Sequence, residues 1–218
     1  STAILIRFLD NVVTWNEDLN ALEKQKMAAR ETRRLGLGIM GIADMLNQLG
    51  LGYDSKEGIA TITQAMEFIT NAAFQASASL AGEKGASPIY SEEEYMKCPF
   101  IEAALSKETQ SLIRENGIRN IAIMSIAPTG SISNIIKGIQ VGGKNYIGVS
   151  GGVEPIFALY YTRRTESFKK NEFYKVFHST VQAYIDKMDL RKEMEAADKI
   201  EEILPDYFLR TAHHIKPD

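Results

Sequence analysis

Cysteine is almost absent from this chain, because Cys98 is the only one among 218 residues. A single cysteine excludes an internal disulfide framework and a zinc site made of several cysteines. The sequence also lacks any apolar run near the ~18–20 residues that a membrane-spanning helix requires. Its first residues, Ser1-Thr2-Ala3, have neither the basic start nor the cleavage site of a signal peptide. These absences predict a cytoplasmic protein without a membrane anchor.

An excess of basic residues is lacking as well. Lys and Arg number 25 against 28 Asp and Glu, which gives a formal net charge of −3. The basic surface that is typical of nucleic-acid-binding proteins is therefore not expected. Hydrophobic residues make up 44% of the chain, an ordinary share for a globular protein, and the length suffices for one domain or two small ones.

Helical periodicity is the strongest local signal in what the sequence does contain. Residues 55–84 carry apolar side chains at steps of three and four, which predicts one long amphipathic helix. Asp54 and Gly85 suit its two ends, and its alanine-rich second half predicts a close approach to a neighbouring element. The charged residues 17–34 fit either a solvated helix or an extended connection. Further helices are predicted over 3–15, 42–49, 171–188 and, with interruptions, from 91 to about 116.

Two apolar runs, residues 119–127 and 153–162, predict buried strands. Helical patterns lie before, between and after these two runs. Because strands that alternate with helices usually pair in parallel, we expect an α/β architecture with parallel strands.

The small hydroxyl-rich turn after the first predicted strand is the clearest candidate site. Unpaired backbone N–H groups at the start of a helix attract anions, glycine permits close approach, and hydroxyl groups add hydrogen bonds. The turn therefore predicts a phosphate site that needs no Lys or Arg, although the same residue types also suit a plain helix cap. Its spacing is not that of a Walker loop. The residues of the turn are Thr129, Gly130, Ser131, Ile132 and Ser133.

Several stretches of the chain, taken in order, resemble one protein family. Two of them contain the glycine-rich segment and the turn, and the other two lie further along the chain. Together they resemble the catalytic chain of ribonucleotide reductases, and Pro-Thr-Gly-Ser is most similar to the adenosylcobalamin-dependent, class II branch. The stretches are R-R-L-G-L-G-I-M-G-I-A-D-M-L (33–46), R-N-I-A-I-M-S-I-A-P-T-G-S-I-S (119–133), G-V-S-G-G-V-E-P-I-F-A (148–158) and L-P-D-Y-F-L-R-T-A-H-H-I-K-P-D (204–218).

The resemblance implies a fold and a role for the turn. Residues 1–218 would form a single partial domain, a portion of the family's ten-stranded α/β barrel. In that family the Pro-Thr-Gly-Ser loop closes over the phosphates of the substrate, a ribonucleoside di- or triphosphate. The substrate-phosphate-binding residues implied here are Thr129, Gly130, Ser131, Ile132 through its backbone, and Ser133.

The family's radical chemistry needs residues that this sequence does not contain. In the family a cysteinyl radical removes the ribose 3′ hydrogen, the 2′ hydroxyl leaves as water, and a cysteine pair is oxidised. The finger-loop motif Asn-x-Cys-x-Glu occurs nowhere in this chain, and Cys98 matches none of the catalytic cysteines. We therefore assign no catalytic residue, expect Cys98 to be a buried or half-buried free thiol, and expect the isolated chain to be inactive.

The resemblance also implies the partners of the intact enzyme. They are adenosylcobalamin, a thioredoxin-like dithiol reductant and the remaining portion of the reductase. A partial barrel would expose strand edges and apolar wall, which predicts self-association into a homo-oligomer or a loosened structure. Two other functions stay open: a non-enzymatic phosphate- or nucleotide-binding module, and a fragment of a class I reductase large subunit, which the glycine of Pro-Thr-Gly-Ser disfavours.

Other patterns have plainer interpretations. Residues 36–41 satisfy G-x-G-x-x-G, but no buried strand precedes them. Their glycines are therefore expected to let a strand pack tightly against the following helix, 42–49, rather than to bind a dinucleotide. His213-His214 is expected to be a surface pair and not part of a metal site. Tyr160-Tyr161 is interpreted as core and barrel wall, and Arg163-Arg164 fits either a polyphosphate contact or a solvated strand end.

The connection after the turn departs from the family pattern. Residues 134–148 are longer and richer in glycine than the compact connection expected there, and Gly142-Gly143 predicts a mobile hairpin. Lys137 and Lys144 lie on it and could approach a bound nucleotide. In the next segment Gly151-Gly152 permits a close backbone approach, while Glu154 is expected near the rim of the site without a catalytic role.

Overall fold

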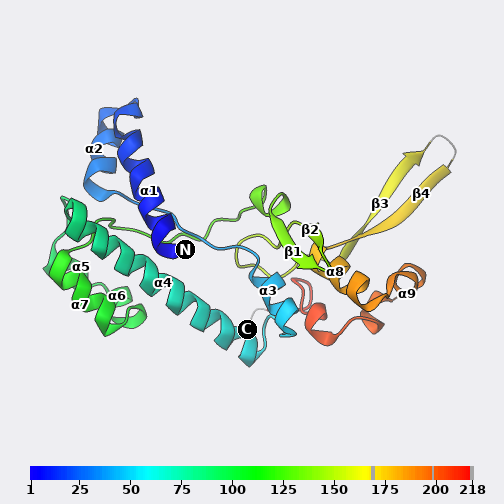
Figure 1. Ribbon diagram of the computed structural model, residues 1–218. Coiled ribbons are helices and arrows are strands. Elements are labelled where there is room, and N and C mark those ends of the chain that lie inside the picture. The colour runs from blue at the N-terminus through cyan, green and yellow to red at the C-terminus, as the bar shows by residue number, and fades with distance from the viewer. Residues whose placement is uncertain (168–169, 198, 217–218) are drawn as a thin grey trace. The chain divides into compact units, whose positions relative to one another are not determined.

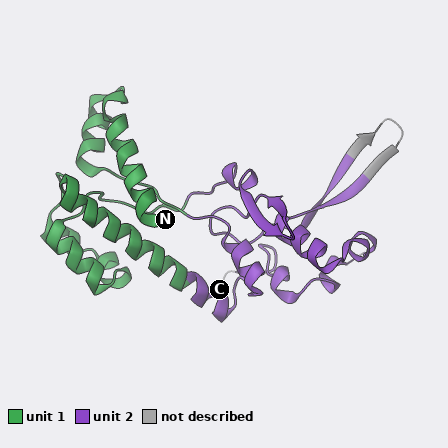
Figure 2. Cartoon of the chain, viewed as in Figure 1, with its two compact units in different colours: residues 1–38, 63–126 green, residues 39–62, 127–218 purple. Residues whose placement is uncertain are grey.

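The computed structural model describes residues 1–167, 170–197 and 199–216. The chain forms two compact units, which are described separately (Figure 2). Unit 1 comprises residues 1–38 and 63–126, and unit 2 comprises residues 39–62 and 127–218. The expectation that 1–218 form a single partial domain stays a prediction.

Unit 1 is helical (Figure 1). The predicted helix over 3–15 and the interrupted helical run up to residue 116 are confirmed, and the segment 17–34, which the sequence left open, is largely helical. Its elements are α1 (Thr2–Asn16), η1 (Glu17–Leu19), α2 (Glu23–Thr32), most of α4 (Lys56–Lys84), α5 (Glu92–Met96), α6 (Pro99–Ala104) and α7 (Lys107–Asn116).

Helix α4 confirms the long predicted helix and shows where its apolar face is covered. Ala73 and Ala78 in its second half are both 0% exposed, which agrees with the predicted close approach because alanine keeps neighbouring elements near. The first half differs, since Ile59 is 55% exposed. The hydroxyl of Ser55, rather than Asp54, accepts an amide hydrogen bond at the N-terminus.

No helix of the described residues, α4 included, is long and apolar enough to cross a membrane.

The first predicted strand is extended but does not become a regular strand over 119–127. Its backbone runs beside residues 32–37 of the same unit. The N–H of Leu37 donates to the Ile123 carbonyl at 2.9 Å, and the N–H of Ser125 donates to the Leu37 carbonyl at 2.9 Å. Leu37 and Met124 thereby form an isolated parallel bridge. Parallel pairing occurs at this one position, but no second bridge follows it among the described residues, so the segment is not a regular strand. The regular strands of the described residues pair antiparallel, so the expectation of parallel strands is otherwise wrong.

Close packing explains one glycine of the G-x-G-x-x-G segment. A Cβ atom added to Gly38 would lie 2.4 Å from the Ser125 carbonyl oxygen, far inside normal contact distance. The backbone of the 32–38 segment therefore needs glycine where it passes Ser125. Gly38 is thus a packing residue, as expected, but its close neighbour is Ser125 and not the helix over 42–49 that the sequence predicted.

Unit 2 contains the regular strands of the described residues, arranged as two antiparallel hairpins (Figure 1). The predicted helix over 42–49 is confirmed as α3. A closed barrel is not present among the described residues, which form two two-stranded sheets and the isolated bridge. The elements are α3 (Ile42–Leu49), residues 56–62 of α4, η2 (Ile132–Asn134), β1 (Lys137–Val141), β2 (Lys144–Ile147), β3 (Tyr160–Ser167), β4 (Lys170–Phe177), α8 (Ser179–Met188), α9 (Arg191–Ala196), η3 (Ile200–Glu202) and η4 (Asp206–Leu209).

Two sequence predictions in unit 2 are wrong in their boundaries. The predicted strand over 153–162 is irregular up to Leu159, and the regular strand β3 starts only at Tyr160. The predicted helix over 171–188 starts at Ser179, because the residues before it belong to β4. Cross-strand pairing decides this: Tyr160 lies opposite Phe177 in the hairpin, with ring centroids 5.9 Å apart. Tyr160 is half-buried against the core, while Tyr161, pointing the other way, is 59% exposed.

Candidate functional site

The predicted phosphate turn lies near the start of the second segment of unit 2, and part of it is open to solvent. Gly130 and Ser131 are exposed, and a Cβ atom added to Gly130 would meet no atom within 4 Å. The backbone N–H groups of these two residues have no hydrogen-bond partner within the described part of the chain. Ile132 is 52% exposed, Thr129 is half-buried, and Ser133 is only 4% exposed. The turn therefore presents free amide donors between two anchored ends.

The turn closes on itself through its own backbone. The N–H of Ser133 donates to the Thr129 carbonyl at 2.9 Å, and the side-chain amide of Asn134 donates to the Gly130 carbonyl at 2.5 Å. Thr129 has a φ of +51°, in the left-handed region that a β-branched residue rarely adopts. One turn of 3-10 helix, η2, follows in place of a longer helix. Any attraction for an anion therefore depends on the exposed amides rather than on an aligned helix dipole.

A glycine-containing segment, residues 149–152, supports the first residue of the turn. The N–H of Gly152 donates to Thr129 Oγ1 at 2.7 Å. Since Thr129 Oγ1 accepts this hydrogen bond, its own proton stays available for a second partner. Gly152 has a φ of +43°, and a Cβ atom there would lie 3.0 Å from the Ala127 carbonyl oxygen. Glycine is needed at this position for both reasons.

The same segment supports the other end of the turn. The N–H of Val149 donates to the Ser133 carbonyl at 2.8 Å. A Cβ atom added to Gly151 would lie 2.8 Å from the Pro128 carbonyl oxygen. The close backbone approach that the sequence predicts at Gly151 is therefore confirmed, and the approaching group is the backbone that leads into the turn.

A buried carboxylate holds this supporting segment. Asp44 of α3 is 2% exposed, and its Oδ2 accepts the N–H of Ser150 at 2.5 Å. Its Oδ1 accepts the hydroxyl of Thr180 and lies 3.6 Å from Nδ1 of His178. Burial lowers the pKa of His178, although the charge of Asp44 acts in the opposite direction. Gly41, at the start of α3, donates its N–H to the Ser150 carbonyl at 3.0 Å.

Sequence reasoning did not single out Asp44 as a functional residue. It lies in the G-L-G-I-M-G-I-A-D stretch that was quoted for the family resemblance, so the resemblance was the one signal that contained it. Its two hydrogen-bond partners are 106 and 136 residues away in the sequence. Local patterns could not predict either contact.

The hairpin after the turn is formed, but Lys144, one of its two lysines, is already paired. Gly142 and Gly143 have φ values of +56° and +79°, as a tight two-residue turn between antiparallel strands requires. Lys144 Nζ and the hydroxyl of Tyr146 both donate to Asp186 of α8. Burial alone would raise the pKa of Asp186, but these hydrogen bonds outweigh it and hold the pKa below its ordinary value. Lys144 is thus directed towards α8.

Among the described residues, the other side chains that the sequence singled out form no hydrogen bond or ion pair with the turn. His213 and His214 are exposed, as predicted, and Arg163, Arg164, Lys137 and Glu154 are exposed too. Among the described residues no group of three His, Cys, Asp or Glu is placed to hold a metal ion.

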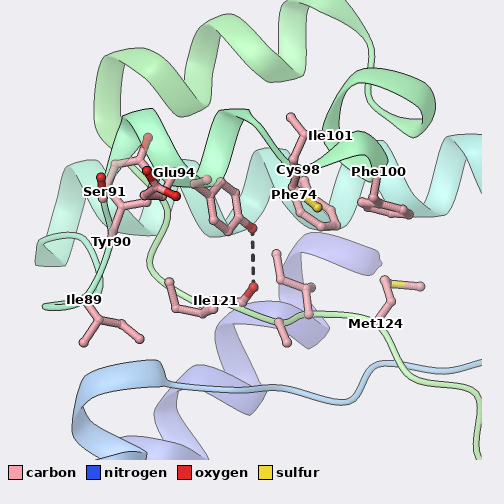
Figure 3. Close-up of a pocket in the computed structure, with 13 residues that line it drawn as sticks. Phe74, Ile89, Tyr90, Ser91, Glu94, Cys98, Phe100, Ile101, Ile121 and Met124 are labelled. Atoms are coloured by element: carbon pink, nitrogen blue, oxygen red, sulfur yellow. Dashed lines mark hydrogen bonds between the residues drawn. The ribbon is translucent and has the colours of Figure 1, made fainter.

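Cys98 is exposed, so its predicted burial is wrong. It belongs to unit 1, between α5 and α6, and lines a cavity of about 670 Å³. The cavity has a mainly apolar lining. Figure 3 shows Ile121 and Met124 of the extended segment, residues 119–127, facing Phe74 and Phe100 across it. The hydroxyl of Tyr95 donates to the Ile121 carbonyl at 3.4 Å, which is the dashed line in Figure 3.

Comparisons with known proteins agree on one family. The family model described as "Ribonucleotide reductase, barrel domain" matches residues 1–218. The chain is 35% identical over 162 residues to the vitamin B12-dependent ribonucleoside-diphosphate reductase of Mycobacterium tuberculosis (strain CDC 1551 / Oshkosh), a match covering 73% of this chain and 19% of that protein. It is 32% identical over 221 residues to the protein of the same name from Thermoplasma acidophilum, covering 97% of this chain and 24% of that one.

A solved structure shows the fold likeness. The alpha subunit of the class Id ribonucleotide reductase of Actinobacillus ureae aligns with a TM-score of 0.59 and 19% identity, over 96% of this chain and 34% of that chain. These findings confirm a reductase-type α/β fold. The chain spans about a fifth of the length of the curated relatives that it matches.

Proposed function

The chain belongs to the ribonucleotide reductase barrel-domain family, and on this basis we propose that it is part of a reductase that converts ribonucleotides to deoxyribonucleotides. Within that enzyme it contributes the loop that binds the phosphates of the substrate. The observation that carries this proposal is the pair of exposed, unpartnered amides at Gly130 and Ser131, in the stretch that resembles the family's phosphate loop. The names of the relatives favour a ribonucleoside diphosphate as the substrate.

Phosphate binding at this loop follows from its chemistry. The N–H groups of Gly130 and Ser131 and the hydroxyls of Thr129 and Ser131 are donors that a phosphate oxygen would accept. Gly130 leaves room for the anion to reach the backbone. Ser133 is buried, so its part in the site is to close the turn through its N–H rather than to contact the ligand. Ile132 would contribute through its backbone, as the resemblance implies.

The radical chemistry of the proposed enzyme lies outside this chain. Cys98 is placed in unit 1 on the lining of an apolar cavity, and no described residue forms the cysteine constellation of the family. The described residues alone therefore do not fit adenosylcobalamin, and we assign them no chemical step that involves this cofactor. We propose that the remaining portion of a ten-stranded barrel supplies the radical and redox cysteines. The intact enzyme would use adenosylcobalamin as its cofactor and a thioredoxin-like protein as its reductant, and it would act in the cytoplasm. The vitamin B12-dependent relatives support this cofactor.

Deoxyribonucleotide formation tests the assignment of the chain. The 218-residue chain, supplied with adenosylcobalamin, a dithiol and a ribonucleoside diphosphate, should form no deoxyribonucleotide, whereas a protein that also contains the Asn-x-Cys-x-Glu portion should form it. Turnover by the chain alone would contradict the division of labour proposed here. A complete protein that binds nucleotide but never reduces it would favour the non-enzymatic alternative.

The phosphate loop itself is tested by removing one amide. Ser131 has a φ of −83°, close to the range that proline adopts, so Ser131→Pro removes the N–H with little strain. Titration of the chain with inorganic pyrophosphate, followed through the backbone amide signals of residues 129–133, should show binding that Ser131→Pro weakens about tenfold. Ser131→Ala keeps the amide and should weaken binding less. Lys144→Ala is the matched control, and loss of binding in that variant would assign the anion to the hairpin instead.

The open edge in unit 1 is the proposed contact for the remaining portion of the reductase. Hydrogen bonds to Leu37 use the Ile123 carbonyl and the Ser125 amide, so the N–H and carbonyl of Met124 face the opposite edge. The apolar cavity that contains Cys98 lies along this segment. Co-expression with the remaining portion should slow the reaction of Cys98 with a thiol reagent, as quantified by mass spectrometry of its peptide. Equal labelling with and without that portion, together with concentration-dependent self-association of the chain, would favour a homo-oligomeric contact.

A further inference from the structure

Asp44 has no hydrogen bond to the turn itself among the described residues, but it is connected to the turn through the supporting segment, residues 149–152. We infer that Asp44 is a positioning residue for phosphate binding: it fixes the free amides of the loop by holding the backbone of Ser150. This inference rests on the proposed function of the loop and names the residue that gives the site its shape.

Both backbone groups of Ser150 are hydrogen-bonded to α3 or to Gly41, the residue that precedes it. Its N–H donates to Asp44 Oδ2 at 2.5 Å, and its carbonyl accepts the N–H of Gly41 at 3.0 Å. The bond to Asp44 is a buried hydrogen bond to a carboxylate, the stronger kind. The hydroxyl of Ser150 has no hydrogen-bond partner among the residues that the structure describes, although Ser150 is only 7% exposed. Ser150 is therefore held by its backbone alone.

The residues on each side of Ser150 transmit this position to the loop. Val149 holds the Ser133 end through its N–H at 2.8 Å, and Gly152 holds the Thr129 end through its N–H at 2.7 Å. The free amides lie between these two anchored ends. A shift of Ser150 towards or away from α3 would therefore change the spacing of the donors that face the ligand.

A carboxylate is needed at position 44 because its two oxygens accept from two different donors. Oδ2 takes the Ser150 amide, and Oδ1 takes the hydroxyl of Thr180. Nδ1 of His178 lies 3.6 Å from Oδ1 and itself accepts the N–H of Thr180 at 3.4 Å, so it does not replace either donor. An asparagine at position 44 would offer one acceptor oxygen and direct an NH₂ group at the other donor.

Unit 2 contains a matched control for a purely structural role. Asp186 also accepts hydrogen bonds from several groups, namely Lys144, Tyr146, Gln182 and Arg191. It has no hydrogen bond to the loop or to residues 149–152. If buried or partly buried carboxylates matter only for stability, Asp44→Asn and Asp186→Asn should affect phosphate binding alike.

The experiment is a pyrophosphate titration of the chain, read through the backbone amide signals of the loop, with thermal unfolding in parallel. We expect Asp44→Asn to weaken binding about tenfold and to shift the amide signals of Gly130 and Ser131 in the absence of ligand. Asp186→Asn should bind within about twofold of the unchanged chain even if its melting temperature falls, and Ser150→Ala should bind normally.

The outcomes separate this inference from the proposed function. If the unchanged chain does not bind pyrophosphate, the proposed function of the loop fails, and the ligand-free amide signals still decide whether Asp44 positions it. If the unchanged chain binds and Asp44→Asn binds equally well with an unshifted loop, the inference is overturned while the proposed function stands. If Asp44→Asn does not fold, Thr180→Val decides: weaker binding supports the inference, and unchanged binding overturns it.

Discussion

Asp10 in unit 1 and Asp44 in unit 2 are both buried, with exposures of 0% and 2%. They differ in whether the groups that donate hydrogen bonds to them are charged or neutral. Asp10 accepts from the guanidinium groups of Arg33 at 2.9 Å and Arg119 at 2.8 Å. Asp44 accepts from a backbone N–H and a hydroxyl, both neutral. In unit 1 charge pairing thus joins distant segments, whereas in unit 2 one carboxylate holds the backbone segment that is hydrogen-bonded to the candidate site.

The two carboxylates also differ in the segments of the chain that they connect. Burial by itself would raise the pKa of Asp10, but hydrogen bonds from Arg119, Arg33 and Asn120 hold it below its ordinary value. These partners connect α1 with the end of α2 and with the start of the extended segment. No residue of the phosphate loop takes part. Asp10 is therefore expected to matter for the stability of unit 1 and not for phosphate binding.

The largest expected effect comes from Asp10→Ala. The change leaves the side chains of Arg33 and Arg119, which are 6% and 11% exposed, without their main partner. Breaking a buried pair in this way costs about 3–5 kcal/mol of unfolding free energy, measurable by urea unfolding with probes in unit 1. Glu83→Gln removes an exposed pair with Arg7 and is the control, with no measurable change expected. Equal midpoints for Asp10→Ala and the unchanged chain would show that this cluster is dispensable.

A methyl group at Gly151 should have the next largest effect. Its Cβ atom would lie 2.8 Å from the Pro128 carbonyl oxygen, so the backbone must move apart at a cost of about 1–3 kcal/mol. Gly130→Ala, where the added atom meets nothing within 4 Å, should change stability by less than ~0.5 kcal/mol. Urea unfolding of the two variants measures the contrast. Equal stability of both would mean that the loop does not rest on the supporting segment.

Acid sensitivity provides a smaller test of unit 2. The pKa of Asp186 is held below its ordinary value, so its ionised form stabilises the folded state. That contribution is complete above the unfolded pKa of ~3.9 and is lost as the pH falls from there through the folded value. Asp186→Asn should therefore destabilise the chain at pH 7 and have less effect at pH 2–3, as measured by thermal unfolding. A constant difference between the two chains at all pH values would contradict this assignment.

The smallest effect concerns His178, and it should be confined to unit 2. Burial lowers its pKa, so the unfolded chain binds a proton more readily than the folded one. Stability should be complete above the lowered folded-state pKa and the unfolded value of ~6.5, and decrease as the pH falls below ~6.5. His178→Gln should flatten this decrease. All three histidines of the chain lie in unit 2, so probes in unit 1 should show no such step, and a step there would point to another group.

Features that depend on neighbours in the sequence were predicted well. The helices at 3–15 and 55–84 follow from apolar side chains at steps of three and four, and the structure confirms them and the helix expected at 42–49. The turn at Gly142-Gly143 follows from residues that tolerate positive φ. The phosphate loop was identified by its own residues and by ordered motifs around it, although its role stays a proposal.

Features that depend on pairing across the chain were missed. Phe173, Val176 and Phe177 fit a helical spacing, so the segment before Ser179 was predicted as helix, and only its pairing with β3 makes it a strand. Cys98 was expected to be buried because free cysteines usually are, but its place between two short helices leaves it exposed.

By itself the amino-acid sequence determined the family, the long helices and the residues of the loop, because each is written in consecutive or regularly spaced side chains. Only the tertiary structure decided that Asp44 supports the loop, since its hydrogen-bond partners lie 106 and 136 residues further along the chain. The same holds for Asp10 and Arg119, which are 109 residues apart. Hydrogen bonds of this kind depend on distances of a few ångströms in space, and spacing along the chain carries no record of them.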